Sequence, residues 1–342
     1  PLLRPRLITD KQALMRPVTS HLAFLLLLAC AGKGELLQDP GEGNHQIQRE
    51  LALMGTQLQI SITAMSRTQA LKASEAAVRA MERAENRLST WRPNSELSAV
   101  NRGGKPSAKL AAELELATHW AVETDGAFQP RAGALIKAWD LRGKGRIPST
   151  AELELAANDR SQWEEGAFGK GAALDAALTQ LTSSGATHAH LNLGGQIAIT
   201  PGKSTRIQVS HPGDRQSVAV EFMIDGGSVA TSANSEKVRT IDGLSIGHLL
   251  DPRTGRPAPD FGSVTVWAPT AMAADCLSTG LFAMGPDEAM KWAIQQDQVE
   301  VLILIDAPAR LLIRATPKLA KQLSILKSAY TPQDNRPQLL VQ

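Results

Sequence analysis

The sequence predicts an α+β fold in which mainly antiparallel sheets pack against helices. Several short segments alternate apolar and polar residues with a period of two, which is typical of strands with one buried face. Other segments repeat their apolar residues every three to four positions, which is typical of amphipathic helices. The two kinds of segment follow one another in mixed order, without the regular strand–helix alternation of a parallel sheet.

In the N-terminal half, helices dominate the prediction. A strand is expected around Leu58, Ile60 and Ile62, and an amphipathic helix over 68–88. The next helices are expected over 108–123, from Thr150, whose hydroxyl is the expected N-cap, and over 172–183 with Gly185 just past its end.

In the C-terminal half, strands dominate the prediction. They are expected at 188–193, 205–210, 217–224, 244–250, 262–268, 299–305 and 310–315. Helices are expected at 272–284, 286–296 and 317–327.

Composition and charge exclude several classes of protein. The chain has 342 residues, 43% of them hydrophobic and 20% charged, which excludes a disordered chain and allows a core of about two lobes. Residues 1–29 hold four of the 36 basic residues and one of the 34 acidic residues, so 32 basic and 33 acidic residues remain from Cys30 onward. No nucleic-acid partner is expected, because this part is nearly neutral and has no block of like charge.

Residues 1–29 have the pattern of a secretory signal peptide. Basic residues precede the apolar run 22–29, which is too short to span a bilayer, and Leu27-Leu28-Ala29-Cys30 resembles a bacterial lipobox. We expect Cys30 to carry a lipid anchor, 30–50 to form a tether and 51–330 to form the folded domain. Met15 is an alternative start, which would make 1–14 an over-long beginning. The alternative reading is an ordinary buried apolar helix.

A glycine-rich segment precedes the helix expected at 172–183. In Gly166-Ala-Phe-Gly169-Lys170-Gly171 the backbone N–H groups and the helix dipole could receive a phosphate. The segment is not a P-loop, because Glu164 stands at the first glycine position and Gly171 replaces Ser/Thr. The alternative is a glycine-rich helix start without a ligand.

Asp275 and Thr279 lie four residues apart on an expected helix, so their oxygens share one face. A carboxylate and a hydroxyl suit Mg²⁺, which takes few protein ligands and completes its shell with water or phosphate. The alternative is an acidic residue in the first turn of a helix, where the dipole favours it.

His248 precedes the turn-forming run Asp251–Gly255 at the end of an expected strand. A histidine there could act as a base near neutral pH, and Asp251 is a candidate for orienting it. The alternative is a surface histidine beside a turn. No G-x-S-x-G motif is present, and Cys276 falls within an apolar helical pattern, so a hydrolase triad is not supported.

These pieces belong to a longer collinear series. It comprises Met54–Thr56, Leu88–Trp91, Ser95–Leu97, Asn101, Thr124–Phe128, Gly169–Gly171, Asp175, Asn192–Gly195, Ala230–Ser232, His248–Gly255, Ser263–Val266 and Ala274–Thr279. The series resembles the FAD:protein FMN transferases, once described as thiamine-biosynthesis lipoproteins, and covers about residues 50–315.

The resemblance implies a bacterial lipoprotein on the periplasmic side of the cell envelope, with FAD and Mg²⁺ in a cleft between two lobes. Such enzymes transfer FMN through its phosphate to a Ser or Thr hydroxyl of a partner flavoprotein, here a subunit of a membrane redox complex, and release AMP. The implied nucleotide contacts are Met54, Trp91, Ala127, Phe128, Gln129, Glu164, Lys170 and Leu250. The implied metal ligands are Asp275, Thr279 and the carbonyl of Ala167, with Ser278 as a weaker ligand. His248 is the expected base for the acceptor hydroxyl.

Some positions depart from the family pattern. Gln129 and Glu164 stand where the family commonly has Asp, and Ala172 where Tyr is frequent. Two other functions therefore remain open: an FAD pyrophosphatase that gives FMN and AMP, and a periplasmic lipoprotein that binds FAD without turnover.

Overall fold

The computed structural model describes residues 44–234, 238–241, 244–308, 310–326 and 338–341. The expected signal peptide, Cys30 and the tether up to residue 43 lie outside the described residues. Contacts group Glu42–Gln342 as one unit. Within the described ranges, no helix is long and apolar enough to cross a membrane.

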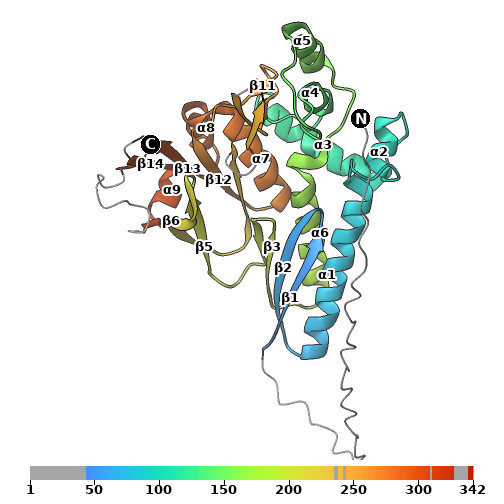
Figure 1. The fold of residues 1–342 in the computed structure, drawn as a ribbon. Coiled ribbons are helices and arrows are strands. Elements are labelled where there is room, and N and C mark those ends of the chain that lie inside the picture. The colour runs from blue at the N-terminus through green and yellow to red at the C-terminus, as the bar shows by residue number, and fades with distance from the viewer. Residues whose placement is uncertain (1–43, 235–237, 242–243, 309, 327–337, 342) are drawn as a thin grey trace, which may run out of the picture. The chain divides into compact units, whose positions relative to one another are not determined.

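A nine-stranded sheet forms the centre of the fold, in the order β1-β2-β3-β4-β7-β12-β13-β14-β16 (Figure 1). Its neighbours pair antiparallel, except for the parallel pair β14–β16. These strands are β1 His45–Leu53, β2 Thr56–Ala64, β3 His188–Leu193, β4 Gln196–Ile199, β7 Gly227–Ala233, β12 Gly262–Ala268, β13 Glu300–Ala307, β14 Arg310–Ala315 and β16 Gln338–Val341.

Three smaller sheets complete the β structure. They consist of β5 Thr205–His211, β6 Asp214–Ile224 and β15 Ser324–Ile325; of β8 Val238–Ile241 and β9 Leu244–Gly247; and of β10 Leu250–Asp251 and β11 Arg256–Pro257. The helices are α1 Arg67–Leu88, α2 Glu96–Asn101, α3 Ala108–Glu123, α4 Gly133–Ala138, α5 Thr150–Asn158, the 3-10 turn η1 Glu165–Ala167, α6 Gly169–Ser183, α7 Ala271–Met284, α8 Pro286–Ala293 and α9 Pro317–Ala320.

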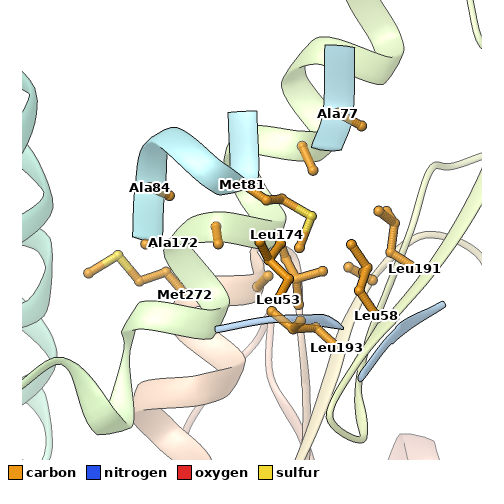
Figure 2. Close-up of a cluster of buried hydrophobic side chains, with 14 of the residues drawn as sticks. Leu53, Leu58, Ala77, Met81, Ala84, Ala172, Leu174, Leu191, Leu193 and Met272 are labelled. Atoms are coloured by element: carbon orange, nitrogen blue, oxygen red, sulfur yellow. The ribbon is translucent and has the colours of Figure 1, made fainter. Parts of the chain in front are cut away.

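Helices α1 and α6 cover one face of strands β1–β3. Leu58, Leu191 and Leu193 from the sheet pack against Met81 of α1 and Leu174 of α6 (Figure 2). Since every second residue of a strand points to the same face, the period-two pattern of the sequence places these leucines together. This core fixes α6, and with it the glycine-rich segment at its start.

Strand β13 separates two further cores. Val301 and Ile303 belong to the cluster formed with α7 and α8, whereas Leu302 and Leu304 point to the other face and pack with β5 and β6. The continuous apolar run of this strand is explained by its burial on both faces. Helix α7 is thereby held between the sheet and α6.

The α+β prediction is confirmed, but four local predictions are wrong. The N-cap of α5 is Ser149 rather than Thr150, in a capping box with Glu152. The expected strand 244–250 is two strands, because the N–H of Leu249 donates to Oδ1 of Asn234 at 3.2 Å and β10 pairs with β11 instead.

The other two errors lie at the ends of the domain. Residues 45–50, expected in the tether, belong to β1, where Ile47 pairs with Ile62 and is buried. The expected helix 317–327 ends at Ala320, because Ile325 pairs with Val220 of β6 and packs into its core. The first segment is held by the adjacent strand β2, and the second by β6, which is distant in the sequence.

Candidate nucleotide and metal site

Helices α6 and α7 begin side by side, and each supplies a capping carboxylate to the other. The N–H of Gly171, in the first turn of α6, donates to Oδ2 of Asp275 at 2.9 Å. The N–H groups of Ala271 and Met272, at the start of α7, donate to Asp175 of α6 at 2.7 and 2.9 Å. The positive ends of two helix dipoles therefore meet at one place, which favours the binding of an anion.

Gly171 makes this close approach possible. A Cβ at this position would lie 2.5 Å from the carbonyl oxygen of Ala271 and 2.6 Å from Cα of Met272. Burial raises the pKa of Asp175, and its two backbone N–H donors oppose that rise. Asp175 belongs to the collinear series found in the sequence, but its function as the cap of α7 follows only from the fold.

Lys170 and Asp275 form an ion pair at this junction. Nζ of Lys170 lies 3.1 Å from Oδ1 of Asp275. The Lys170 side chain is 31% exposed and that of Asp275 only 6%. The cation thus borders solvent while the carboxylate is buried, so a phosphate group can approach Lys170 at the edge of a preformed polar site.

The expected metal ligands supply oxygen donors around Asp275. The hydroxyls of Ser278 and Thr279 both donate to the carbonyl of Asp275, at 3.1 and 3.2 Å, which leaves lone pairs on each oxygen. One lone pair of Ser278 already accepts from the Ser232 hydroxyl at 3.0 Å, in agreement with the expectation that Ser278 is the weaker ligand.

The carbonyl of Ala167 lies in η1, which contacts α7. In a regular helix the N–H of Gly171 would donate to the carbonyl of Ala167, four residues earlier, but here it donates to Asp275. The first backbone hydrogen bond of α6 runs instead from the N–H of Ala172 to the carbonyl of Phe168. A carboxylate, a hydroxyl and a carbonyl form a donor set that fits Mg²⁺. Among the described residues, no group of three or more His, Cys, Asp and Glu side chains could hold a metal ion.

Met54 lies in the two-residue turn between β1 and β2. Met54 and Gly55 have φ values of +50° and +69°, as a tight hairpin turn requires. A Cβ added to Gly169 would lie 3.5 Å from the methyl carbon of Met54, so this expected flavin contact borders the start of α6. An open hollow of about 700 Å³ follows β1 to this turn; Glu85 and Arg92 also line it.

Ala127 and Phe128 are both 1% exposed, with backbone and side chain counted together, so both residues are buried. The turn that carries them packs on α7, where a Cβ on Gly280 would lie 2.8 Å from Cβ of Phe128. Oε1 of Gln129 accepts from the N–H of Arg131 at 3.0 Å. This segment therefore lies beside Gly280, the residue that follows the expected metal ligand Thr279.

Glu164 and Trp91 meet at Arg142. Nη2 of Arg142 lies 2.6 and 2.5 Å from the two carboxylate oxygens of Glu164. The guanidinium carbon of Arg142 lies 4.5 Å from the centre of the Trp91 ring. Burial and the neighbouring Glu165 raise the pKa of Glu164, and Arg142 opposes that rise.

His248 lies between β9 and β10. Asn234 anchors this segment by accepting from the Leu249 N–H and by donating to the carbonyl of Ala258 at 3.0 Å. Asp251 is the residue expected to orient His248. Both of its carboxylate oxygens accept hydrogen bonds from the Arg253 side chain, at 3.0 and 3.1 Å.

Leu250 is partly buried against the hydrophobic clusters of α4 and α5. β10 also contacts α7. Lys170 and Asp275 line neither the hollow at β1 nor a second hollow of about 550 Å³ along α3. The expected cleft between two lobes stays a prediction.

Comparison with known proteins identifies the family. The ApbE family matches residues 54–303. The chain belongs to the ApbE family. Two relatives carry the name FAD:protein FMN transferase: that of Rhodobacter capsulatus is 24% identical over 90% of this chain, and that of Klebsiella pneumoniae is 28% identical over 73%. The chain spans 64% of the length of the first and 82% of the second.

A solved ApbE structure has a similar fold. The crystal structure of the ApbE protein of Thermotoga maritima has a TM-score of 0.68 and is 26% identical, covering 76% of this chain and 94% of its own. The resemblance found in the sequence is thus confirmed at the level of family and fold. Within this ApbE fold, sequence reasoning missed Arg142 and Asn234, for which the local pattern contains no signal.

Proposed function

We propose that this protein is an FAD:protein FMN transferase that moves FMN from FAD to a Ser or Thr hydroxyl of a partner protein and releases AMP. The observation that carries the proposal is the junction of α6 and α7, where two helix N-termini, Lys170 and Asp275 converge. Such a junction can bind the pyrophosphate of FAD and stabilise the charge that develops during its cleavage. The names of the ApbE relatives support the same reaction.

In the proposed reaction the acceptor oxygen attacks the phosphorus of the FMN half. The bond between this phosphorus and the oxygen bridging to AMP breaks, and AMP leaves with the bonding electron pair. His248 would take the proton of the acceptor hydroxyl. Lys170 and the helix starts would hold the pyrophosphate oxygens in line with the attack.

Asp275, Thr279 and the carbonyl of Ala167 would hold Mg²⁺. Bound there, Mg²⁺ would neutralise charge on the phosphate oxygens. Met54, Trp91, Gln129 and Glu164 would bind the flavin nucleotide, together with Ala127, Phe128 and Leu250. These side chains would orient FAD and keep water away from the phosphorus.

We also infer the location and the partner. The leader pattern of residues 1–30 supports a lipid anchor on Cys30 at the periplasmic side of a bacterial membrane. An acceptor of FMN in that compartment would be a flavoprotein subunit of a membrane redox complex. Radiolabelled palmitate incorporated into the wild-type protein, but not into Cys30→Ala, would support the anchor, and an unlabelled wild-type protein would exclude it.

The reaction can be tested with the soluble domain, FAD, Mg²⁺ and several candidate acceptor proteins. A transferase gives flavin fluorescence on the acceptor band of a denaturing gel and an equal amount of AMP. AMP and free FMN formed without any acceptor would indicate the pyrophosphatase instead. FAD that stays bound and intact for hours with Mg²⁺ would indicate a binding protein without turnover.

A further inference from the structure

Arg142 contacts two of the expected flavin ligands but has no role in the reaction proposed above. Its guanidinium group stacks over Trp91, and the same group binds both oxygens of Glu164. It also donates to the carbonyl of Thr90 at 3.3 Å and to the hydroxyl of the same residue. One side chain thus ties together two segments that are more than 70 residues apart in the sequence.

The loop that carries Arg142 is held in place without it. The indole N–H of Trp139 donates to the carbonyl of Gly255 at 2.8 Å, and the N–H of Arg146 returns to the carbonyl of Trp139 at 3.1 Å. The N–H of Gly145 donates to the Asp140 carboxylate at 3.2 Å. The guanidinium group therefore extends from a fixed base, and removing it leaves these backbone contacts intact.

Trp91 needs such a support because it is 66% exposed. Its neighbours are fixed: the Thr90 hydroxyl donates to Glu165, and Arg92 binds Glu85 at 3.0 Å. The guanidinium carbon of Arg142 lies over the ring, 4.5 Å from its centre, and a cation at this distance is attracted to the aromatic face. A ring supported on one face presents its other face for stacking.

Arg142 also reduces the negative charge beside Glu164. Glu164 and Glu165 are adjacent carboxylates with side chains 13% and 10% exposed, and Nη2 of Arg142 lies 3.9 Å from Glu165. Two unpaired carboxylates at this position would repel an anionic nucleotide.

We propose that Arg142 is a positioning residue for the flavin nucleotide. It fixes the plane of the Trp91 ring and the carboxylate of Glu164, and it acts on FAD through these two side chains. The inference rests on the proposed function, since it assumes that FAD binds here. A lysine has one nitrogen and no planar group, so it cannot lie over Trp91 while donating to both Thr90 and Glu164, and the role is specific to arginine.

The test measures FAD binding by calorimetry in EDTA, where no turnover occurs. We expect Arg142→Gln and Arg142→Lys each to raise the Kd for FAD by about tenfold, the scale of a lost stacking contact and a lost charged hydrogen bond. Arg146→Gln is the matched control, because it removes the same charge from the same loop. In the wild type, the described ion pair of Arg146 is with Glu152, not with an expected flavin contact. The Kd of this control variant should equal that of the wild type.

Two further readouts separate positioning from a general loss of structure. Bound flavin should be less quenched in Arg142→Gln than in the wild type at saturation, since the Trp91 ring no longer lies flat against it. In a double-mutant cycle, Arg142→Gln should weaken binding much less in the Trp91→Ala background than in the wild type. If Arg142→Gln does not fold, the same cycle with Arg142→Lys replaces it.

Each outcome decides a different claim. Equal Kd values for the wild type and both Arg142 variants would overturn the positioning role alone. Fully multiplicative effects of Arg142→Gln and Trp91→Ala would also overturn it, because the two side chains would then act independently. A wild-type protein that binds no FAD even with Mg²⁺ present would overturn the proposed function and this inference with it.

Discussion

The two ends of the candidate site are built differently. At the α6–α7 junction, Asp275 and Asp175 bind backbone N–H groups of the facing helix, and Gly171 lets the two helices touch. At the end proposed to bind the flavin, Trp91, Arg142 and Glu164 come from loops, and the side chain of Arg142 contacts the other two. Backbone contacts between packed helices fix positions more strictly than side-chain contacts between loops.

This difference predicts which step each end controls. The rigid junction suits charge stabilisation during phosphorus–oxygen cleavage, because preorganised dipoles need not rearrange in the transition state. The loop end suits recognition of the flavin, where small adjustments are tolerated. Substitutions at the junction should therefore lower the rate or the stability, and substitutions at the loop end should lower the affinity for FAD.

The largest effect is expected from Asp275→Asn. The amide oxygen can still accept from the Gly171 N–H, while the charge that pairs with Lys170 and that would bind the proposed metal is lost. We expect transfer to fall by roughly 100-fold or more, as for the loss of a preorganised electrostatic contact. Asp287→Asn, on the exposed surface of α8, is the control. Full transfer by Asp275→Asn on the flavin-fluorescence gel would mean that the metal binds elsewhere.

His248→Ala tests whether the chemistry extends beyond the helix junction. General-base catalysis contributes on the order of 100-fold or more, so we expect a loss of that size in the rate of transfer. FAD affinity should change little, because His248 lies outside the expected nucleotide contacts. An unchanged transfer rate, measured at saturating FAD, would remove His248 as the base.

Gly171→Ala tests the packing of the junction itself. The new methyl group would overlap backbone atoms of Ala271 and Met272, which cannot move aside like a flexible side chain. We expect a loss of about 1–3 kcal/mol in the free energy of unfolding, measured by urea denaturation, since overpacking of a core costs this much.

Gly166→Ala is the matched control in the same segment, where the nearest atom to the new Cβ is Oε1 of Glu164 at 3.6 Å. If both variants unfold at the same urea concentration as the wild type, the two helix starts are not held as tightly as the geometry indicates.

The same difference decides what could be predicted from the sequence. The leucines at 58, 191 and 193 alternate within their own segments, so the strands that carry them were predicted correctly. Asp275 and Thr279 both lie in α7, so the helix predicted to carry them is confirmed, while their role as a metal-binding pair stays a prediction. A local pattern is sufficient where the structure depends on neighbouring residues.

Contacts between distant segments left no such pattern. Arg142 lies 22 residues before Glu164 and stacks on a ring of a third segment, so nothing near residue 142 indicates its role. The predicted C-terminal helix is shorter than expected because Ile325 pairs with Val220 of β6 as part of a strand. The end of the site around Trp91 and Glu164 depends mainly on such contacts, which explains why these residues were proposed as flavin contacts only through the family resemblance.

The smallest effect is expected at Glu152, far from the junction, in the capping box of α5. Hydrogen bonds from Ser149, and one from Arg146, lower the pKa of Glu152 to about 2. Because the pKa is lower in the folded state, Glu152 stabilises the protein above its ordinary pKa of 4.5, and this contribution is lost as the pH falls toward 2. Glu152→Gln should therefore lower Tm slightly at pH 6, and the difference from the wild type should disappear near pH 2. A constant difference in Tm between pH 2 and 6 would show that the charge of Glu152 does not support the cap.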